Sequence, residues 1–434
     1  MKKLLIINIA ALGHNISSLM KEKGYNASWT GLLKGKVNSV FPAVTCSVQA
    51  SFKTASTPDV HGMTFNGFFD QKLCKPLFWE QSSKLLDISP FWNEKEFQNI
   101  ETASLFWQQS LDSQTDIILS PAPIHKHHGG MIQDCYSRPA DLYNSICEKI
   151  GSFNLMNYWG PFAGIKSSQW ISEATIFTMK NLAPDLVLTY LPHLDYILQK
   201  EGLDALNSEK AFNQLGSILD VLIHHASQMG YHVIFFGDYA MQNVDSVVYP
   251  NKILKENGLF KCREIKNMLY PDYYATKAIA VTDHQIAHIM ISDKKSKEFV
   301  KSLFDQTKGI QDVLDTEQQK AMNIFHENSG DLILLAEPNA WFSYKWWDKK
   351  KNAPDYASHV DIHNKPGFDP CELFMEWPNP FKVSSDDTRI KGSHGICSKE
   401  TSVIWGTDIE IETQPKTIIE IAEIAKNFLR KHNK

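Results

Sequence analysis

Short apolar runs alternate with amphipathic segments of helical period along most of the chain. The runs are rich in β-branched residues and end at turn residues, which predicts strands at 4–9, 116–119, 185–190, 232–236, 278–281, 286–291 and 331–335. The segments between them predict helices at 140–150, 168–181, 211–229, 297–304 and 417–429. This alternation is typical of an α/β fold, a three-layer α/β/α sandwich with a mostly parallel central sheet.

The N-terminal residues have two interpretations, a signal peptide or a strand. Lys2 and Lys3 followed by apolar residues imitate a short leader. Asn8 interrupts the apolar stretch and no small-residue cleavage pattern follows it, so we expect a strand that leads into a helix at 15–23. We expect one catalytic domain over 1–434, with 243–326 as a small inserted cap subdomain. The Pro-rich stretch 341–391 predicts a long, irregular and polar loop region.

Composition and charge exclude several classes of protein. Hydrophobic residues make up 43% of the 434 residues, enough apolar surface for a large core. Lys and Arg number 44 against 49 Asp and Glu, a net charge of −5, which argues against nucleic acid as a partner. No window approaches the roughly 20 apolar residues of a membrane span. The seven Cys are scattered without C-x-x-C spacing, so we expect a reducing, cytoplasmic location. The sequence leaves a homo-oligomer open.

A threonine hydroxyl lies at the predicted start of a helix. In F-P-A-V-T-C-S-V-Q, Pro42 interrupts the preceding chain and a helix is predicted at 46–52, so Thr45 is expected to be its N-cap. There the backbone N–H groups and the helix dipole favour negative charge. Such a hydroxyl is either an ordinary cap or a nucleophile, and a nucleophile needs a metal or a base to activate it. A Pro-Asp turn then leads to Asn66, an amide donor suited to stabilising a transferred group.

Carboxylates follow two of the predicted strands. Asp195 comes shortly after 185–190, and Asp238 comes directly after 232–236. A carboxylate at such a position is costly unless a cation meets it, so metal ligation is one explanation and a helix cap or salt bridge is the other. His394 lies between glycines in G-S-H-G, where it is either a ligand or an ordinary loop residue.

Three further clusters contain histidine. His127 and His128 precede two glycines in a loop after a strand, which suggests anion or metal binding. Asp361 and His363 lie two residues apart in the irregular region, and 282–288 spaces two histidines four residues apart. We favour Asp361 and His363 as metal ligands and interpret the second histidine of 282–288 as a core residue.

The order of these features resembles the alkaline phosphatase superfamily, specifically its type I phosphodiesterase and nucleotide pyrophosphatase branch, with phosphonoacetate hydrolase as a relative. The matching segments are P-A-V-T with Thr45, T-A-S-T-P-D-V-H-G-M-T-F-N with Asn66, Y-L-P-H-L-D with Asp195, F-G-D-Y-A-M with Asp238 and G-S-H-G with His394. The resemblance spans nearly the whole chain. It implies that Thr45 is the nucleophile and that Asn66 donates to a non-bridging phosphoryl oxygen.

The resemblance also implies two cations, usually zinc, beside the threonine. One would be held by Asp195, Gln199 and His394. Gln199 replaces a histidine of the family, and its oxygen favours a harder cation than zinc. The other site would contain Asp238 and Thr45, but Ala10 and Tyr239 stand where the family has an aspartate and a histidine.

These observations predict a metal-dependent hydrolase of a small phosphodiester, nucleotide pyrophosphate or phosphonate, with one or two ions of Zn, Mn, Mg or Ca. The residues expected to contact the substrate are His127, His128 and Tyr239, with Trp159, Trp346 and Trp347 around the leaving group. The alternative is a catalytically degenerate member of the superfamily that serves as a ligand-binding or pathway-assembly protein. A sulfatase or mutase relative is disfavoured, because the Thr45 loop lacks the C/S-x-P-S-R pattern.

Overall fold

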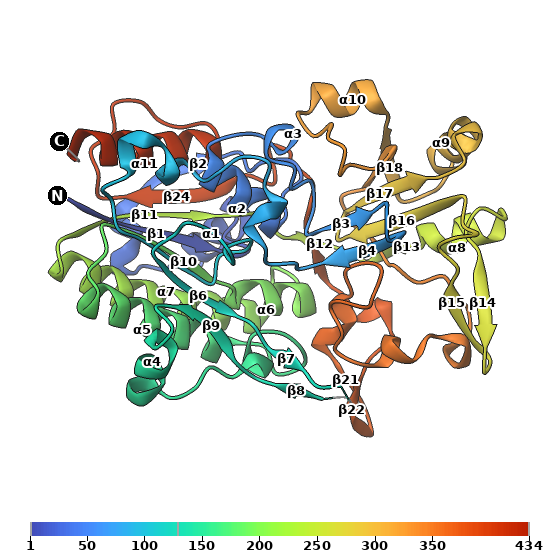
Figure 1. Ribbon diagram of the computed structural model, residues 1–434, viewed down its shortest axis with the longest axis horizontal. Coiled ribbons are helices and arrows are strands. Elements are labelled where there is room, and N and C mark those ends of the chain that lie inside the picture. Colours follow the sequence, from blue (N-terminus) through green and yellow to red (C-terminus); the bar gives the residue numbers. More distant parts are fainter. Residues whose placement is uncertain (1, 128–129, 433–434) are drawn as a thin grey trace.

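The structure is a computed structural model that describes residues 2–127 and 130–432 (Figure 1). Its centre is an eight-stranded sheet in the order β2-β24-β11-β1-β10-β5-β6-β9. The strands are β1 (Lys3–Ile9), β2 (Leu33–Val37), β5 (Thr102–Leu105), β6 (Ile117–Pro121), β9 (Cys135–Arg138), β10 (Leu186–Leu191), β11 (Tyr231–Gly237) and β24 (Val403–Thr407). The strands from β11 to β6 pair in parallel, whereas β24 and β9 pair antiparallel with them and β2 pairs antiparallel with β24. The predicted mostly parallel sheet is confirmed.

The N-terminal segment is the strand β1, as predicted. It pairs with β10 on one side and β11 on the other. Its residues from Leu4 to Ile9 are all buried, which explains the nearly continuous apolar run, because a central parallel strand is covered on both faces. The carboxyl ends of β1, β10 and β11 therefore lie next to one another, where an open α/β sheet usually binds its ligand.

Helices cover both faces of this sheet (Figure 1). One face has α2 (Thr45–Thr54) and α11 (Ile418–His432), which contact each other, and the other has α4 (Leu142–Ile150), α5 (Ile165–Asn181), α6 (His193–Glu201) and α7 (Leu206–Gln228). The short helices α1 (His14–Glu22) and α3 (Pro58–His61) follow β1 and α2 along the chain. The three-layer α/β/α sandwich is confirmed. Within the described ranges, no helix combines the length and apolar character needed to cross a membrane.

A smaller sheet lies beside the large one (Figure 1). Its order is β16-β17-β19-β18, and its strands are β16 (Ala278–Asp283), β17 (Ile286–Ile291), β18 (Ile310–Leu314) and β19 (Leu332–Ala336). The helices α8 (Pro250–Glu256), α9 (Lys297–Asp305) and α10 (Thr316–Ala321) belong to the same stretch of chain. Phe304, Phe342 and Trp346 lie in a separate hydrophobic core there. A subdomain confined to 243–326 stays a prediction, and the sheet itself includes β19 beyond that limit.

The remaining strands form two-stranded ribbons. They are β3 (Gly67–Asp70) with β4 (Lys75–Phe78), β7 (Ile124–His125) with β8 (Met131–Ile132), β12 (Gln242–Asn243) with β23 (Gly392–Ser393), β13 (Ser246–Val248) with β20 (Ala340–Phe342), β14 (Cys262–Ile265) with β15 (Met268–Pro271), and β21 (Met375–Glu376) with β22 (Asn379–Val383). The stretch 341–391 is irregular, as predicted. It is not a polar surface loop, however, because Lys345, Trp346 and Lys365 are buried in it.

Candidate active site

Thr45 is the first residue of α2, a helix whose ten residues are all buried. Val44 is the N-cap residue, and its side chain makes no capping hydrogen bond. The cap comes instead from Asn66, whose Oδ1 accepts a hydrogen bond from the Cys46 N–H at 3.0 Å. The prediction that Thr45 caps the helix is therefore wrong. Thr45 already has helical backbone, so Asn66 takes the place that a capping side chain normally has.

Asp195 lies on α6 with Gln199 one turn further on, as the spacing predicts. The Gln199 Nε2 donates to Asp195 Oδ2 at 2.6 Å, and the Tyr239 hydroxyl donates to Asp195 Oδ1 at 3.0 Å. Burial raises the pKa of Asp195. Both oxygens of this buried carboxyl group are thus satisfied by neutral donors.

His394 follows β23 and points its Nδ1 at the Ala43 carbonyl, 2.8 Å away. A carbonyl only accepts, so Nδ1 carries the hydrogen and Nε2 keeps its lone pair. Nε2 lies 3.9 Å from Asp195 Oδ1. Burial, and then the neighbouring His284, lower the pKa of His394 well below the usual value, so the imidazole is neutral. The contact with Ala43 ties this imidazole to the segment that precedes Thr45.

Asp238 lies at the end of β11 and is fully buried. Its Oδ1 accepts hydrogen bonds from the N–H groups of Ala11 at 3.1 Å and Tyr239 at 2.9 Å. Its Oδ2 has no partner among the described residues. Burial, and then the charge of Asp195, raise the pKa of Asp238 well above the usual value. A buried carboxylate oxygen without a partner is an atom that a cation would satisfy.

The donors fit one divalent cation but not two. For the first site, His394 Nε2 has a lone pair beside Asp195, and the Gln199 Oε1 is buried without a partner. The second site lacks two of its ligands, because Ala10 has no ligand atom and Tyr239 directs its hydroxyl to Asp195. Among the described residues, Asp238 Oδ2 and Thr45 alone remain there. Across residues 2–127 and 130–432, no three His, Cys, Asp or Glu side chains are grouped closely enough to hold a metal ion.

The β16–β17 hairpin adds two residues, Asp283 at the end of β16 and His284 in the turn, which are not among the favoured candidates from the sequence. Asp283 accepts hydrogen bonds from Asn66 and from the His284 Nδ1, the latter at 2.7 Å. The His284 ring lies 3.8 Å from the His394 ring and 3.7 Å from the Phe368 ring, measured between centroids. The sequence feature that could have identified them is the adjacent carboxylate and imidazole of Asp283 and His284, which follow the strand predicted at 278–281.

The other predicted ligands and substrate contacts lie elsewhere. The Asp361 carboxylate accepts hydrogen bonds from Asn364, and the exposed His363 places its Nδ1 3.1 Å from the Phe78 carbonyl. Neither side chain forms a hydrogen bond with Asp195. His127 is exposed in the turn between β7 and β8, and His128 lies outside the described residues.

Of the three tryptophans expected around the leaving group, only Trp159 lies beside the stacked rings of Phe368, His284 and His394. Its ring centroid is 5.5 Å from that of Phe368. Trp346 belongs to the second core, where its Nε1 donates to the Leu269 carbonyl, and Trp347 packs against it. The expectation that Trp346 and Trp347 line a leaving-group pocket is therefore wrong, because their side chains fill a hydrophobic core.

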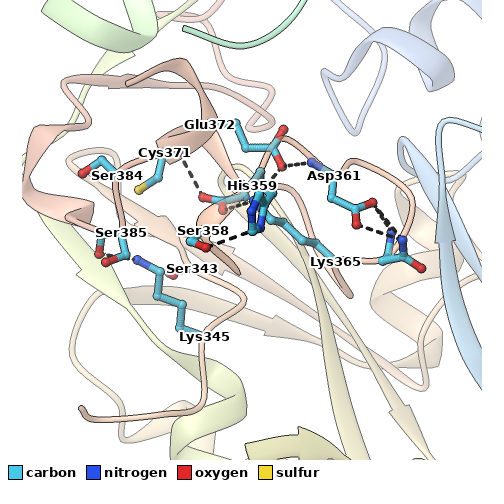
Figure 2. Close-up of polar contacts among 12 residues, drawn as sticks. Ser343, Lys345, Ser358, His359, Asp361, Lys365, Cys371, Glu372, Ser384 and Ser385 are labelled. Carbon is cyan, nitrogen blue, oxygen red and sulfur yellow. Dashed lines mark hydrogen bonds and ion pairs between the residues drawn. The ribbon is translucent and has the colours of Figure 1, made fainter. Parts of the chain in front are cut away.

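Buried ion pairs hold the segment that carries Phe368 (Figure 2). The Lys365 Nζ lies 2.8 Å from Asp369 Oδ2 and 2.6 Å from Glu372 Oε1. Burial acts to lower the pKa of Lys365, but the charges of the two carboxylates outweigh it and the pKa is raised. Figure 2 shows Glu372 between Lys365 and Asp361, whose backbone N–H donates to the same carboxylate. This arrangement fixes the loop that presents Phe368 to His284.

The eight-stranded, mostly parallel sheet with helices on both faces is the alkaline phosphatase-like fold. Residues 8–369 match the family of type I phosphodiesterases and nucleotide pyrophosphatases, and the chain belongs to that family. No curated protein matches the sequence at a significant level.

Three solved structures share the fold at low sequence identity. Phosphonoacetate hydrolase from Sinorhizobium meliloti 1021 has a TM-score of 0.64 and 11% identity over 98% of this chain and 96% of that chain. Murine ectonucleotide pyrophosphatase/phosphodiesterase 5 has a TM-score of 0.60 and 11% identity over 99% and 95%. Its human counterpart has a TM-score of 0.59 and 12% identity over 99% and 95%. The family and these neighbours are hydrolases, and the structural likeness at this identity concerns the fold alone.

Proposed function

We propose that this chain hydrolyses a small phosphodiester, nucleotide pyrophosphate or phosphonate, with Thr45 as the nucleophile. The observation that carries the proposal is the way the site surrounds Thr45. Two residues before it, the Ala43 carbonyl holds His394, and directly after it, the Cys46 N–H is held by Asn66. The segment matched by the family model includes Thr45, Asn66 and Asp195.

The chemistry follows from these positions. The Thr45 hydroxyl oxygen attacks phosphorus, the bond to the leaving group breaks, and the leaving group departs with a proton. Asn66 donates from Nδ2 to a non-bridging oxygen, and the N-terminal end of α2 favours the negative charge that builds up there. Water then attacks phosphorus in the threonyl ester, releases the second product and restores the Thr45 hydroxyl.

A single divalent cation fits this proposal, held by Asp195, Gln199 and His394. When bound, it would supply electrostatic stabilisation of the phosphoryl oxygens and the nucleophile. Two of its three protein ligands are oxygens, so Mn, Mg or Ca suits the set at least as well as Zn. The structure supports no assignment of Asp361 and His363 to the same ion, and they stay separate candidates.

The substrate class is supported by the ligands of the structural neighbours. The Sinorhizobium meliloti enzyme is described in complex with phosphonoacetate and phosphonoformate, and an inactive variant of the murine protein is described in complex with AMP. These ligands share a phosphorus centre bearing negative oxygens. A small molecule of that kind is the partner that we propose for this chain.

The experiment is a substrate panel with matched threonine variants. Purified protein is assayed with bis(4-nitrophenyl) phosphate, ATP and phosphonoacetate, with Mn, Zn, Mg or Ca supplied in turn. We expect turnover that falls at least about 1000-fold in Thr45→Ala. Thr54→Ala is the control, because Thr54 ends the same helix and donates its hydroxyl to the Ala50 carbonyl. The absence of Thr45-dependent turnover across the panel would contradict the proposal.

A second candidate function is ligand binding without catalysis. The observation that favours it is the pairing of both Asp195 oxygens with the neutral donors Gln199 and Tyr239, which leaves the carboxyl group satisfied without a cation. This alternative predicts binding of phosphonoacetate or phosphate that Thr45→Ala does not change, with no turnover. Stoichiometric cation binding would argue against it.

A further inference from the structure

We infer that Asp283 and His284 are positioning residues of the Thr45 site, reaching it from the smaller sheet to orient Asn66 and His394. This inference rests on the proposed function, because it assigns a role within the same site. Neither residue belongs to the motifs that resemble the family. Asp283 is the last residue of β16 and His284 begins the turn to β17, and both are buried.

Asp283 determines which way the Asn66 carboxamide faces. Its Oδ2 accepts the Asn66 backbone N–H at 2.8 Å, and its Oδ1 accepts from the Asn66 Nδ2 at 3.1 Å. The opposite end of the carboxamide, Oδ1, accepts the Cys46 N–H at 3.0 Å. A carboxylate only accepts and an amide nitrogen carries two hydrogens, so these contacts allow one orientation. The second Nδ2 hydrogen is thereby available to a phosphoryl group at Thr45.

His284 braces the other side of the site. Its Nδ1 donates to Asp283 Oδ1 at 2.7 Å, so the same carboxylate holds both the amide and the imidazole. Its ring lies between those of His394 and Phe368, at centroid distances of 3.8 and 3.7 Å. Since Tyr239 lies flat on His394 at 3.4 Å, His394 is clamped between two rings.

The backbone of the turn is shaped for this contact. His284 has a φ of 61°, a left-handed conformation that is uncommon for a residue other than glycine. The next residue, Gln285, donates its N–H to the His394 carbonyl at 2.9 Å, and the His284 carbonyl accepts from the Phe342 N–H at 2.8 Å. Strained backbone of this kind persists where surrounding contacts determine it, and it is concentrated at functional sites. The smaller sheet therefore contributes to a site whose other residues come from helices and loops around the large sheet.

The consequence is that Asp283 acts through Asn66. In Asp283→Asn, the new amide can donate to the Asn66 side-chain oxygen, and the Asn66 carboxamide is free to turn. The Cys46 N–H then loses its acceptor, and an oxygen instead of a hydrogen faces the phosphoryl group. In a chain that carries Asn66→Ala, Asp283→Asn should therefore lower kcat no further.

The test combines a double-mutant cycle with amide hydrogen exchange of the Cys46 N–H. In Asp283→Asn we expect exchange about 10-fold faster and kcat about 10- to 100-fold lower with little change in KM, as for the loss of one donor to a transition state. The double variant Asn66→Ala with Asp283→Asn should have the same kcat as Asn66→Ala alone. The reversed pair, Asn66→Asp with Asp283→Asn, should restore Cys46 protection but not kcat. Asp331→Asn is the control, because Asp331 accepts the Ile291 N–H at the far end of β17.

The inference would be overturned if the Cys46 N–H exchanged at the wild-type rate in Asp283→Asn. It would also be overturned if the losses of kcat in Asn66→Ala and Asp283→Asn multiplied in the double variant. If Asp283→Asn does not fold, two variants of His284 provide the test. His284→Phe keeps the ring stack and should retain kcat within about threefold, whereas His284→Ala should lower kcat about 10-fold. Equal losses in Phe and Ala would also overturn it. A chain with no Thr45-dependent turnover would contradict the proposed function alone, because the exchange measurement needs no substrate.

Discussion

The Tyr239 ring lies flat against the His394 imidazole, with 3.4 Å between centroids and an angle of 3° between planes. The same side chain donates its hydroxyl to Asp195 Oδ1. One tyrosine thus contacts two of the three residues that would hold the cation. It stands where the sequence resemblance places a histidine ligand of the second cation, so the proposed second site would lack that ligand, and the Tyr239 hydroxyl occupies an oxygen of Asp195 that the proposed first site would use.

Replacing Tyr239 by phenylalanine should destabilise the cation-free protein. The ring stack on His394 is kept, but the buried Asp195 loses a hydrogen-bond donor, which costs about 1–3 kcal/mol. A cation that binds Asp195 should offset this loss. Urea unfolding with and without Mn is the measurement. Tyr231→Phe is the control, because the Tyr231 hydroxyl donates to the Pro184 carbonyl. The decrease in its free energy of unfolding should be the same with and without Mn. Equal stability of Tyr239→Phe and the wild type would contradict the account.

The wild-type chain should bind no more than one divalent cation. Ala10 and Tyr239 leave the second site without two of its donors, and the described side chains do not replace them. Isothermal titration with Mn or Zn, checked by elemental analysis, measures the stoichiometry. Ala10→Asp combined with Tyr239→His should raise it toward two. Two tightly bound cations in the unmodified chain would show that the reading of this site is wrong.

Lys365→Met should destabilise the fold by about 3–5 kcal/mol, because it leaves the buried carboxylates of Asp369 and Glu372 without their cation. Denaturant unfolding gives the value. Lys320 forms an exposed pair with Glu317 at 2.9 Å, and Lys320→Met should change stability by less than about 1 kcal/mol. A loss of similar size in the two variants would contradict the assignment of Lys365 to a buried ionic cluster.

Stability should rise with pH above 7 because of Lys53. This side chain is buried in α2, where its Nζ donates to the Gln108 carbonyl at 2.6 Å, and burial lowers its pKa to about 7. Between that value and the pKa of 10.5 taken for the unfolded chain, the unfolded state binds more protons than the folded state. The free energy of unfolding therefore gains up to about 1.4 kcal/mol per pH unit over this interval. Thermal or urea unfolding from pH 7 to 10 should show a shallower slope in Lys53→Met. Identical slopes in the two proteins would refute the prediction.

Much of the fold follows from local pattern. The central parallel strands are continuous apolar runs, so β1, β10 and β11 are evident from the sequence. The strand β5 is not, because it is only four residues long and includes the polar Thr102, whose hydroxyl pairs with Asp116. The strand β24 is equally hard to predict, because it returns from the far end of the chain to pair with β11 and has a glycine within it.

The candidate site, like the fold, is predicted only in part from the sequence. The order of the motifs predicts that Thr45, Asn66, Asp195 and His394 lie in one site, and the i, i+4 spacing places Gln199 beside Asp195. The cap of α2 was predicted at Thr45 because local sequence does not reveal that Asn66, one loop later, returns to the helix. The position of the 282–288 cluster in the site depends on how the smaller sheet packs beside the large one. The hydrophobic periodicity of the individual strands gives no information on that packing.

The stereochemistry at phosphorus tests the central claim most directly. A chiral phosphorothioate diester is hydrolysed in water labelled with ¹⁸O, and the configuration of the product is determined. Attack by Thr45 followed by attack of water is two in-line displacements, each of which inverts the centre, so the account predicts net retention. Net inversion would show that water attacks the substrate directly and would contradict a threonine nucleophile.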